Sequence, residues 1–224
     1  DLLDRYILAK TRSLVEAATD SLDAYDLAGA CAHISTFLEA LNNWYIRRSR
    51  ERFWAPAGAD TAADKQAAYN TLYTVLNVVS RIAFFFNATA TTEIYTGLTD
   101  DASVHLADWP DAEALPANPD LISTMDRLRE VCSTALSLRE DRGLRTRLPS
   151  ARITIAANDS SVTEALASVA HLIADEVNVK DVAFSNDVAA FGNFVLKPDG
   201  RLLGPKLGGG VQGVIKAAKA GKWT

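Results

Sequence analysis

Apolar residues recur at steps of three and four positions, or at multiples of these steps, along most of the chain before Leu148. Such stripes are typical of amphipathic helices that bury one face. The pattern predicts four long helices: one running from about Leu3 past Leu22, one from a cap at Asp26 to about Phe53, one from Asp64 to about Phe86, and one from about Asp120 to Arg139. Long helices that each bury one stripe pack together, so the sequence predicts a mainly α fold with an antiparallel helix bundle.

The pattern changes at Leu148-Pro149, where short alternating runs and turn residues replace the long helical stripes. These runs predict a smaller set of elements: a strand at 152–155, a helix at 161–174, strands at 177–184 and 191–196, and a last helix at 211–220. The chain stops soon after that helix, with no closing strand. We therefore predict a helical domain over residues 1–147, followed by a small, truncated α+β module over residues 148–224.

The net charge of −5 at pH 7 argues against a general nucleic-acid binder, because most such proteins are basic. The charge is unevenly distributed, however, since seven lysine and arginine residues stand against three aspartates between Lys180 and Thr224. The acidic remainder contains two arginine clusters: Arg47, Arg48, Arg50 and Arg52, and Arg139, Arg142, Arg145 and Arg147. Clusters of this kind are where a phosphate backbone could dock.

The composition is that of an ordinary soluble protein, with 48% hydrophobic residues and a mean hydropathy near zero. No apolar run approaches the roughly 20 residues that cross a bilayer. The opening DLLDRYILAK lacks the apolar core of a secretory signal. Two widely separated cysteines indicate a reducing compartment. We predict a cytoplasmic chain with no membrane partner, and its start without Met fits a piece of a longer protein.

No set of residues predicts a catalytic or metal centre. Cys31 and His33 would project about 200° apart on a helix, so we expect them to be core residues and not metal ligands. The acidic pair Asp175-Glu176 is predicted to lie in a solvated turn between a helix and a strand. The glycine-rich loop at 204–210 lacks the Gly-Lys-Ser/Thr ending of a nucleotide-binding loop. An independent small enzyme is therefore the weakest interpretation.

The stretch from Asn42 to Trp54, NNWYIRRSRERFW, interleaves aromatic and arginine residues at the end of a predicted helix. Aromatic faces stack unpaired bases and arginines bind phosphates, so one interpretation is contact with RNA. The other is an ordinary amphipathic helix end, with Trp44 and Tyr45 in the core and the arginines forming a solvated face. Spacing alone does not separate the two interpretations.

This same stretch, LNNWYIRRSRERFW, resembles the signature helix in the anticodon-binding domain of isoleucyl-tRNA synthetases, which are class I aminoacyl-tRNA synthetases. Its WYIRRSR core distinguishes it best from the related valyl, leucyl and methionyl enzymes. Further segments resemble the family in the same order, so the resemblance covers nearly the whole chain: the opening from DRYILAK to the arginine stretch, TTEIYTGLTDDASVHLADWP, MDRLREVCSTALSLRED, LIADEVNVKDV and LGPKLGGGVQGVIKA. One departure is FFFNATA at 84–90, which has no proline where the family usually has a proline-containing break.

The resemblance implies that this segment binds tRNA and recognises the anticodon. The longer enzyme would join isoleucine to its tRNA, using ATP and Mg²⁺. The implied partners are isoleucine tRNA and the catalytic body of that enzyme, not DNA. The HIGH and KMSKS signatures of class I synthetases do not occur in this sequence. We therefore expect the segment by itself to be inactive, with no catalytic residue, cofactor or metal of its own.

The candidate tRNA-binding residues form two groups: Arg47, Arg48, Arg50, Arg52 and Trp54 in the aromatic-arginine stretch, and Lys197, Arg201 and Lys206 as a weaker second patch. The arginines of the first group could instead pack on the catalytic body. Two other functions remain open. One is a helical protein-interaction domain without an RNA role, and the other is the anticodon domain of a related synthetase such as the valyl enzyme.

Overall fold

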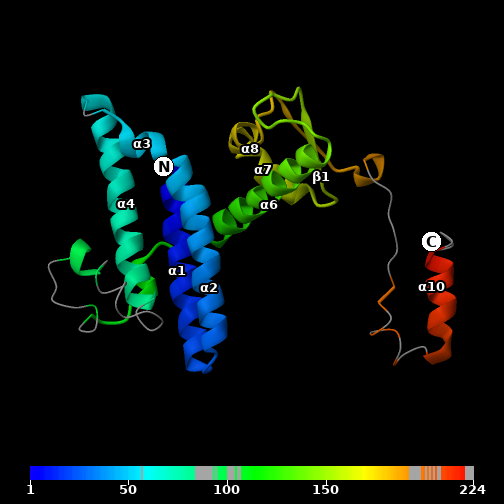
Figure 1. Ribbon diagram of the computed structural model, residues 1–224, viewed down its shortest axis with the longest axis horizontal. Helices are drawn as coiled ribbons and strands as arrows, with labels where there is room; N and C mark the ends of the chain where they lie inside the picture. Colours follow the sequence, from blue (N-terminus) through cyan, green and yellow to red (C-terminus); the bar gives the residue numbers. More distant parts are fainter. Residues whose placement is uncertain are drawn as a thin grey trace. The chain divides into compact units, whose positions relative to one another are not determined.

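The structure is a computed structural model of the chain (Figure 1), and it describes residues 1–56, 58–83, 93, 95–99, 104, 107–191, 198, 199, 201, 203, 205 and 208–219. Contacts between Cα atoms divide the chain into two compact units, Asp1–Asp126 and Arg127–Thr224, which we call unit 1 and unit 2. The division falls within helix α6 (Pro119–Asp141). The predicted domain boundary between residues 147 and 148 stays a prediction.

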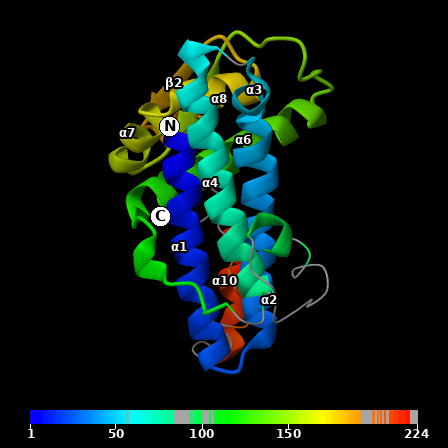
Figure 2. The same cartoon turned by 90° about the vertical axis from the view of Figure 1, so that its left-hand side faces the viewer.

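Three long helices form the body of unit 1: α1 (Leu2–Asp23), α2 (Leu27–Ala40) and α4 (Ala59–Ala83). Helix α1 packs against both α2 and α4; α2 runs antiparallel to α1, and α4 runs in the same direction as α1 (Figures 1 and 2). The apolar stripes predicted from the sequence face inward, since Ile7, Ile34 and Val75 are all buried. The predicted mainly α class and the antiparallel bundle are confirmed.

The second predicted helix is not continuous. Helix α2 passes into a π-helical turn, η1 (Leu41–Ile46), and a short helix, α3 (Arg50–Trp54), follows it. A π turn widens the helix and displaces the register of the residues beyond it. Here the wide turn carries a group of apolar residues that are all buried, Leu41, Trp44 and Tyr45. Helix α3 then ends before Pro56, because the residue that precedes a proline is disfavoured in the helical conformation.

Helix α4 begins at Ala59, five positions before the predicted start at Asp64. Its last described residue is Ala83, so the predicted end near Phe86 and the proline-free segment at 84–90 lie outside the described residues. The inward stripe agrees with the prediction, because Ala68, Val75 and Ile82 are fully buried. The helix is therefore longer at its start than the hydrophobic pattern indicates.

The segment before α6 lies along α1. The indole nitrogen Nε1 of Trp109 donates to Oγ1 of Thr19 at 3.0 Å, and Nη1 of Arg12 donates to the carbonyl oxygen of Leu115 at 3.1 Å. A short 3₁₀ turn, η3 (Ala112–Ala114), separates these two contacts. Tertiary hydrogen bonds thus fix a stretch that has no regular helical pattern.

Unit 2 contains a small parallel sheet of β1 (Ile153–Ala156) and β2 (Val182–Ser185). Two short helices connect the strands, α7 (Ser160–Ala167) and α8 (Ala170–Val177). A parallel pair needs such a crossover, because the chain must return to the same end of the sheet. The remaining described elements are η4 (Val188–Ala190), η5 (Gly208–Gly210) and α10 (Val211–Lys219). The predicted α+β module and its last helix are confirmed in these elements.

Three predictions within unit 2 were wrong. The expected strand at 177–184 begins only at Val182, because Val177 ends α8 and Asn178 takes a left-handed conformation with φ 54°. Consequently Asp175-Glu176 lies inside α8 and not in a turn after a helix. The single helix expected at 161–174 is divided into α7 and α8. The strand expected at 191–196 falls mostly outside the described residues, and Phe191 itself is in a turn.

Within the described part of the chain, no helix is both long enough and apolar enough to span a bilayer.

The cap of α2 gives a first testable prediction. A carboxylate oxygen of Asp26 accepts a hydrogen bond from the backbone N–H of Gly29 at 2.9 Å. Replacing Asp26 by Ala leaves that donor without its partner, and we expect the free energy of unfolding to fall by about 1 kcal/mol. Urea denaturation measures the loss. As a control, Asp23→Ala removes an exposed carboxylate that caps no helix start, so an equal loss in both variants would contradict the capping role.

Candidate nucleic-acid interface

The aromatic-arginine stretch divides into a buried side and an exposed side. The side chains of Trp44 and Tyr45 belong to the core, with 7% and 0% of their surface exposed. Trp54, at the end of α3, is instead 77% exposed. Of the aromatic residues in this stretch, Trp54 is therefore the one placed to stack on a ligand.

Arg52 lies at the centre of an ion-pair network. Its Nη1 and Nη2 atoms bind the two carboxylate oxygens of Asp4 at 2.8 and 2.7 Å. Its Nε and Nη2 atoms bind the carboxylate of Asp64, both at 2.8 Å, and Asp1 is 3.2 Å away. The guanidinium of Arg52 thus joins α1, α3 and α4. Only 13% of its side chain is exposed, so little of it faces a ligand in solution.

Tyr45 completes this network from the core side. Its hydroxyl donates to Oδ1 of Asp4 at 2.8 Å. Burial by itself raises the pKa of Asp4, but hydrogen bonds from Arg52 and then Tyr45 outweigh burial and hold this pKa below its usual value. Burial and the neighbouring Asp4 carboxylate raise the pKa of Tyr45. The hydrogen bond to Asp4 is the largest cause that raises the pKa of Arg52. All three groups therefore keep their ordinary charges at neutral pH.

The other three arginines of the stretch differ in their surroundings. The guanidinium carbon of Arg48 lies 5.7 Å from the centroid of the Trp44 ring, which is a cation–π contact. Nε of Arg47 donates to the carbonyl oxygen of Asn43 at 2.7 Å, while the side chain stays exposed. Arg50 is also exposed. The arginines at 47 and 50 are thus the two of this cluster that face solvent.

A surface groove of about 520 Å³ brings some of the candidates together. We call it the α3–α4 groove, and it is lined by Asn42, Ile46, Arg47, Arg50, Phe53, Trp54, Tyr69 and Leu72. Its walls combine two guanidinium groups with exposed aromatic rings. The groove includes neither Arg48 nor Arg52, so the five predicted residues of the stretch do not all line it.

Tyr69 is a candidate that the sequence interpretation missed. It is 47% exposed and lines the groove, and its ring packs edge-to-face on Phe53 with centroids 5.3 Å apart. Tyr73, one turn further along α4, is exposed to the same extent. Both residues fall off the inward stripe of α4. That departure from the helical pattern was the signal in the sequence that could have found them.

The weaker second patch is only partly described. Arg201 is exposed, and its backbone N–H donates to Oδ1 of Asp199 at 2.8 Å. Lys197 and Lys206 lie outside the described residues. The patch therefore stays a prediction.

The predicted packing of Cys31 and His33 was wrong, because both are exposed on α2. The core stripe of α2 instead uses Ala30, Ile34 and Phe37, which leaves positions 31 and 33 on the outer face. Across the residues that the structure describes, no group of three or more His, Cys, Asp or Glu side chains is arranged to hold a metal ion.

Comparison with known proteins identifies the kind of domain to which this groove belongs. The family model described as the anticodon-binding domain of tRNA ligase matches residues 4–155. The chain belongs to this family. The match includes α2, α3 and α4 and all of α1 except its first two residues, and with them the α3–α4 groove.

Whole-chain relatives agree with this assignment. The chain is 52% identical to the isoleucine–tRNA ligase of Nocardia farcinica over 223 residues, which is 100% of this chain and 20% of that protein. It is 48% identical to the isoleucine–tRNA ligase of Corynebacterium efficiens, again over 100% of this chain and 20% of that protein. It is 44% identical to the isoleucine–tRNA ligase of Mycobacterium tuberculosis over 98% of this chain and 20% of that protein. The chain thus spans about one fifth of the length of these relatives. The resemblance found in the sequence is confirmed.

The Arg52 network gives a second testable prediction. Replacing Asp4 by Asn removes the carboxylate that Arg52 and Tyr45 share, and we expect the free energy of unfolding to fall by about 2 kcal/mol at pH 7. The folded state lowers the pKa of Asp4, so its stabilisation is present above the unfolded pKa of about 3.9 and is lost as pH falls through the folded value. The wild type and the variant should therefore converge in acid.

Denaturation of the wild type and of the Asp4→Asn variant between pH 7 and pH 2 measures how their difference in stability depends on pH. The matched control is Glu16→Gln, which breaks an exposed ion pair with Arg12 at 2.8 Å and should cost no more than about 0.5 kcal/mol. A difference between Asp4→Asn and the wild type that persists unchanged below pH 3 would show that the carboxylate charge is not the source of the effect.

Proposed function

We propose that this chain binds tRNA as the anticodon-recognition segment of an isoleucine–tRNA ligase. The observation that carries the proposal is its membership of the anticodon-binding family together with its similarity to isoleucine–tRNA ligases along its whole length. The complete enzyme would join isoleucine to its tRNA in the cytoplasm, using ATP and Mg²⁺ held by other segments. These relatives favour the isoleucine enzyme over the valyl alternative.

The α3–α4 groove supports a division of roles within this function. Arg47 and Arg50 are exposed cations that would bind RNA phosphates. Trp54 and Tyr69 offer aromatic faces on which an unpaired base would stack. An anticodon loop presents both chemistries side by side, since its bases are unpaired and its backbone is charged. We assign the second phosphate contact to Lys197, Arg201 and Lys206.

Arg48 and Arg52 would act on the RNA indirectly. Arg48 is held over the Trp44 ring, and Arg52 is bound by the acidic residues of α1 and α4. Both side chains fix the position of the helix end from which Arg47, Arg50 and Trp54 project. Their replacement should therefore reduce stability first and RNA affinity only as a consequence.

The competing function is that of a helical protein-interaction domain with no RNA role, in which the same groove docks on a protein. The exposed Trp54 ring favours this possibility equally, because exposed tryptophan and arginine residues are enriched at protein interfaces. The two functions differ in their response to salt and to phosphate-binding variants. A binding experiment with tRNA distinguishes them.

We expect the chain to bind isoleucine tRNA more tightly than a non-cognate tRNA, as measured by fluorescence anisotropy of labelled tRNA. If about six phosphates are neutralised, the affinity should fall about a thousandfold between 50 and 200 mM salt. The double variant Arg47→Gln, Arg50→Gln should lower the slope of log affinity against log salt by about one for each lost phosphate contact. Arg5→Gln, which removes an exposed arginine of α1 outside the groove, is the control for net charge.

An affinity for tRNA that does not respond to salt, or that the groove variant leaves unchanged, would exclude phosphate binding in the α3–α4 groove. Docking on the catalytic body would then be the better assignment for these arginines.

Replacing Trp54 by Ala tests the stacking role separately. Loss of one stacked base costs roughly 1–3 kcal/mol, so the affinity for isoleucine tRNA should fall between about 5-fold and 150-fold. The salt slope should stay the same, because no phosphate contact is lost. Trp54→Phe keeps an aromatic face and should recover most of the affinity. Equal losses in the Ala and Phe variants would contradict stacking.

A further inference from the structure

The second arginine cluster of the sequence lies at the end of α6 in unit 2, and the structure separates its members. Arg139 is only 6% exposed, whereas Arg142, Arg145 and Arg147 are exposed. Between Arg139 and Arg152 the chain carries five arginines and only two acidic residues. Positive charge is thus concentrated in this one loop of unit 2.

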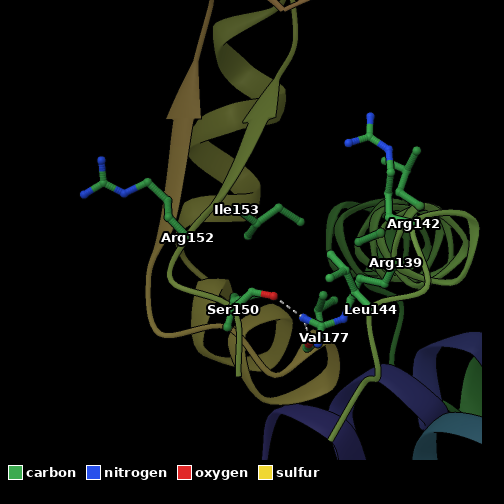
Figure 3. A pocket seen from close by; sticks show the side chains of 10 residues that line it. Arg139, Arg142, Leu144, Ser150, Arg152, Ile153 and Val177 are labelled. Carbon is green, nitrogen blue, oxygen red and sulfur yellow. Dashed lines mark hydrogen bonds between the residues drawn. The ribbon is translucent and has the colours of Figure 1, made fainter. Parts of the chain in front are cut away.

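Arg139 holds that loop in place. Its Nη1 atom donates to Oγ of Ser150 at 2.5 Å and to the carbonyl oxygen of Val177 at 3.3 Å (Figure 3). Its Nη2 atom donates to the carbonyl oxygens of Arg145 at 2.8 Å and of Leu148 at 2.5 Å. One guanidinium therefore ties the loop after α6 to the end of α8, and the exposed arginines of the loop stand on a fixed backbone.

The acceptors of Arg139 are all uncharged. Among the described residues no carboxylate pairs with it, and its Nε atom is buried without a hydrogen-bond partner. These four hydrogen bonds offset part of the cost of burying the cation, but its net positive charge remains in the space beside it. That space therefore favours an anion. Arg52 of unit 1 shows the contrast, because three aspartates surround it.

A hollow of about 280 Å³ lies beside Arg139, and we call it the α6–β1 hollow. Its apolar lining comes from Ala135, Leu138, Leu144, Ile153, Val177 and Val179. Leu138 and Leu144 are more than half exposed, with 57% and 54% of their surface in solvent. The hollow therefore offers an exposed apolar surface beside the exposed arginines of the loop.

The guanidinium groups of Arg142 and Arg152 extend from opposite sides of this hollow (Figure 3). Arg152 is already paired with Asp181. Arg142 is exposed, and the described residues give its guanidinium no hydrogen bond or ion pair. Arg142 is therefore the cation at the rim that remains available to a ligand.

We propose that the α6–β1 hollow binds one unpaired nucleotide of RNA. The base lies on the apolar floor against Leu144 and Ile153. Its phosphate lies at the rim beside Arg142, and the guanidinium of Arg139 lies at the other end of the hollow, next to Ser150 (Figure 3). Arg145 and Arg147 follow at short intervals on the same loop and contact neighbouring phosphates, as a repeating backbone charge allows. The inference rests on the proposed function, because tRNA is the RNA that this chain would meet.

The direct test is a titration of the ¹⁵N-labelled chain with a single-stranded uridine trinucleotide, followed by NMR. We expect saturable shifts at the backbone amides of Leu144 and Ile153 and at the Nε–H of Arg139. Inorganic phosphate in a second titration should shift Arg139 but not Ile153, since it has no base. The variant Arg142→Gln, Arg145→Gln should weaken trinucleotide binding at least fivefold, and its unchanged urea midpoint would show that the fold is intact.

Absence of shifts at these positions under saturating trinucleotide would overturn the proposal. So would equal shifts with a glutamate-leucine peptide of the same charge, because the hollow would then be a protein-docking site. Arg5→Gln serves again as the charge control and should leave the titration unchanged.

A parallel tRNA titration separates this inference from the proposed function. We expect Arg142→Gln, Arg145→Gln to lower the affinity for isoleucine tRNA about fivefold or more and to reduce the salt slope. If only the Arg47 and Arg50 variant loses affinity, the hollow has no tRNA role and the proposed function stands. If the wild-type chain binds the trinucleotide in the hollow but binds no tRNA, the proposed function fails while the nucleotide site stands.

Discussion

The guanidinium of Arg52 connects the three helix segments on which the α3–α4 groove is built. It binds Asp4 of α1 and Asp64 of α4 from its place on α3, and Tyr45 closes the network from the core. A buried charge is tolerated only when opposite charges and hydrogen bonds surround it, and here they do. Removing Asp4, the least exposed of the three aspartates, would take from Arg52 and Tyr45 the carboxylate that they share. The position of the short helix α3 therefore depends on electrostatics as well as on packing.

This constraint separates structural from functional arginines within one short stretch. The arginines at 48 and 52 are held by the Trp44 ring and by aspartates, while those at 47 and 50 face solvent beside Trp54. The π turn between α2 and α3 contributes to this division, because it places Leu41, Trp44 and Tyr45 together in the core. The held arginines and the buried aromatic residues thus form a fixed support for an exposed surface of cations and aromatic rings. Such a surface has the chemistry that an unpaired RNA loop requires.

Arg52 and Arg139, whose side chains have little exposed surface, use their charge differently. Aspartates neutralise Arg52, which links α1, α3 and α4. Arg139 is bound by uncharged oxygens of its own loop, so it organises that loop and also leaves a positive field beside an apolar hollow. The same residue type therefore stabilises a bundle in one unit and prepares an anion site in the other. The difference lies in the acceptors that the fold supplies, not in the arginine.

The sequence by itself determined the helix bundle, the α+β module and the family resemblance, because helical periodicity and a long specific motif are local properties. Only the structure decided that Trp44 and Tyr45 belong to the core. The sequence could not determine where the second helix breaks or where α8 ends, since a π turn and the left-handed Asn178 depend on packing beyond the local pattern. Nor could it tell Arg52 from Arg50. Their local patterns are alike, but only the tertiary structure brings Asp4 and Asp64 to one of them and leaves the other in solvent.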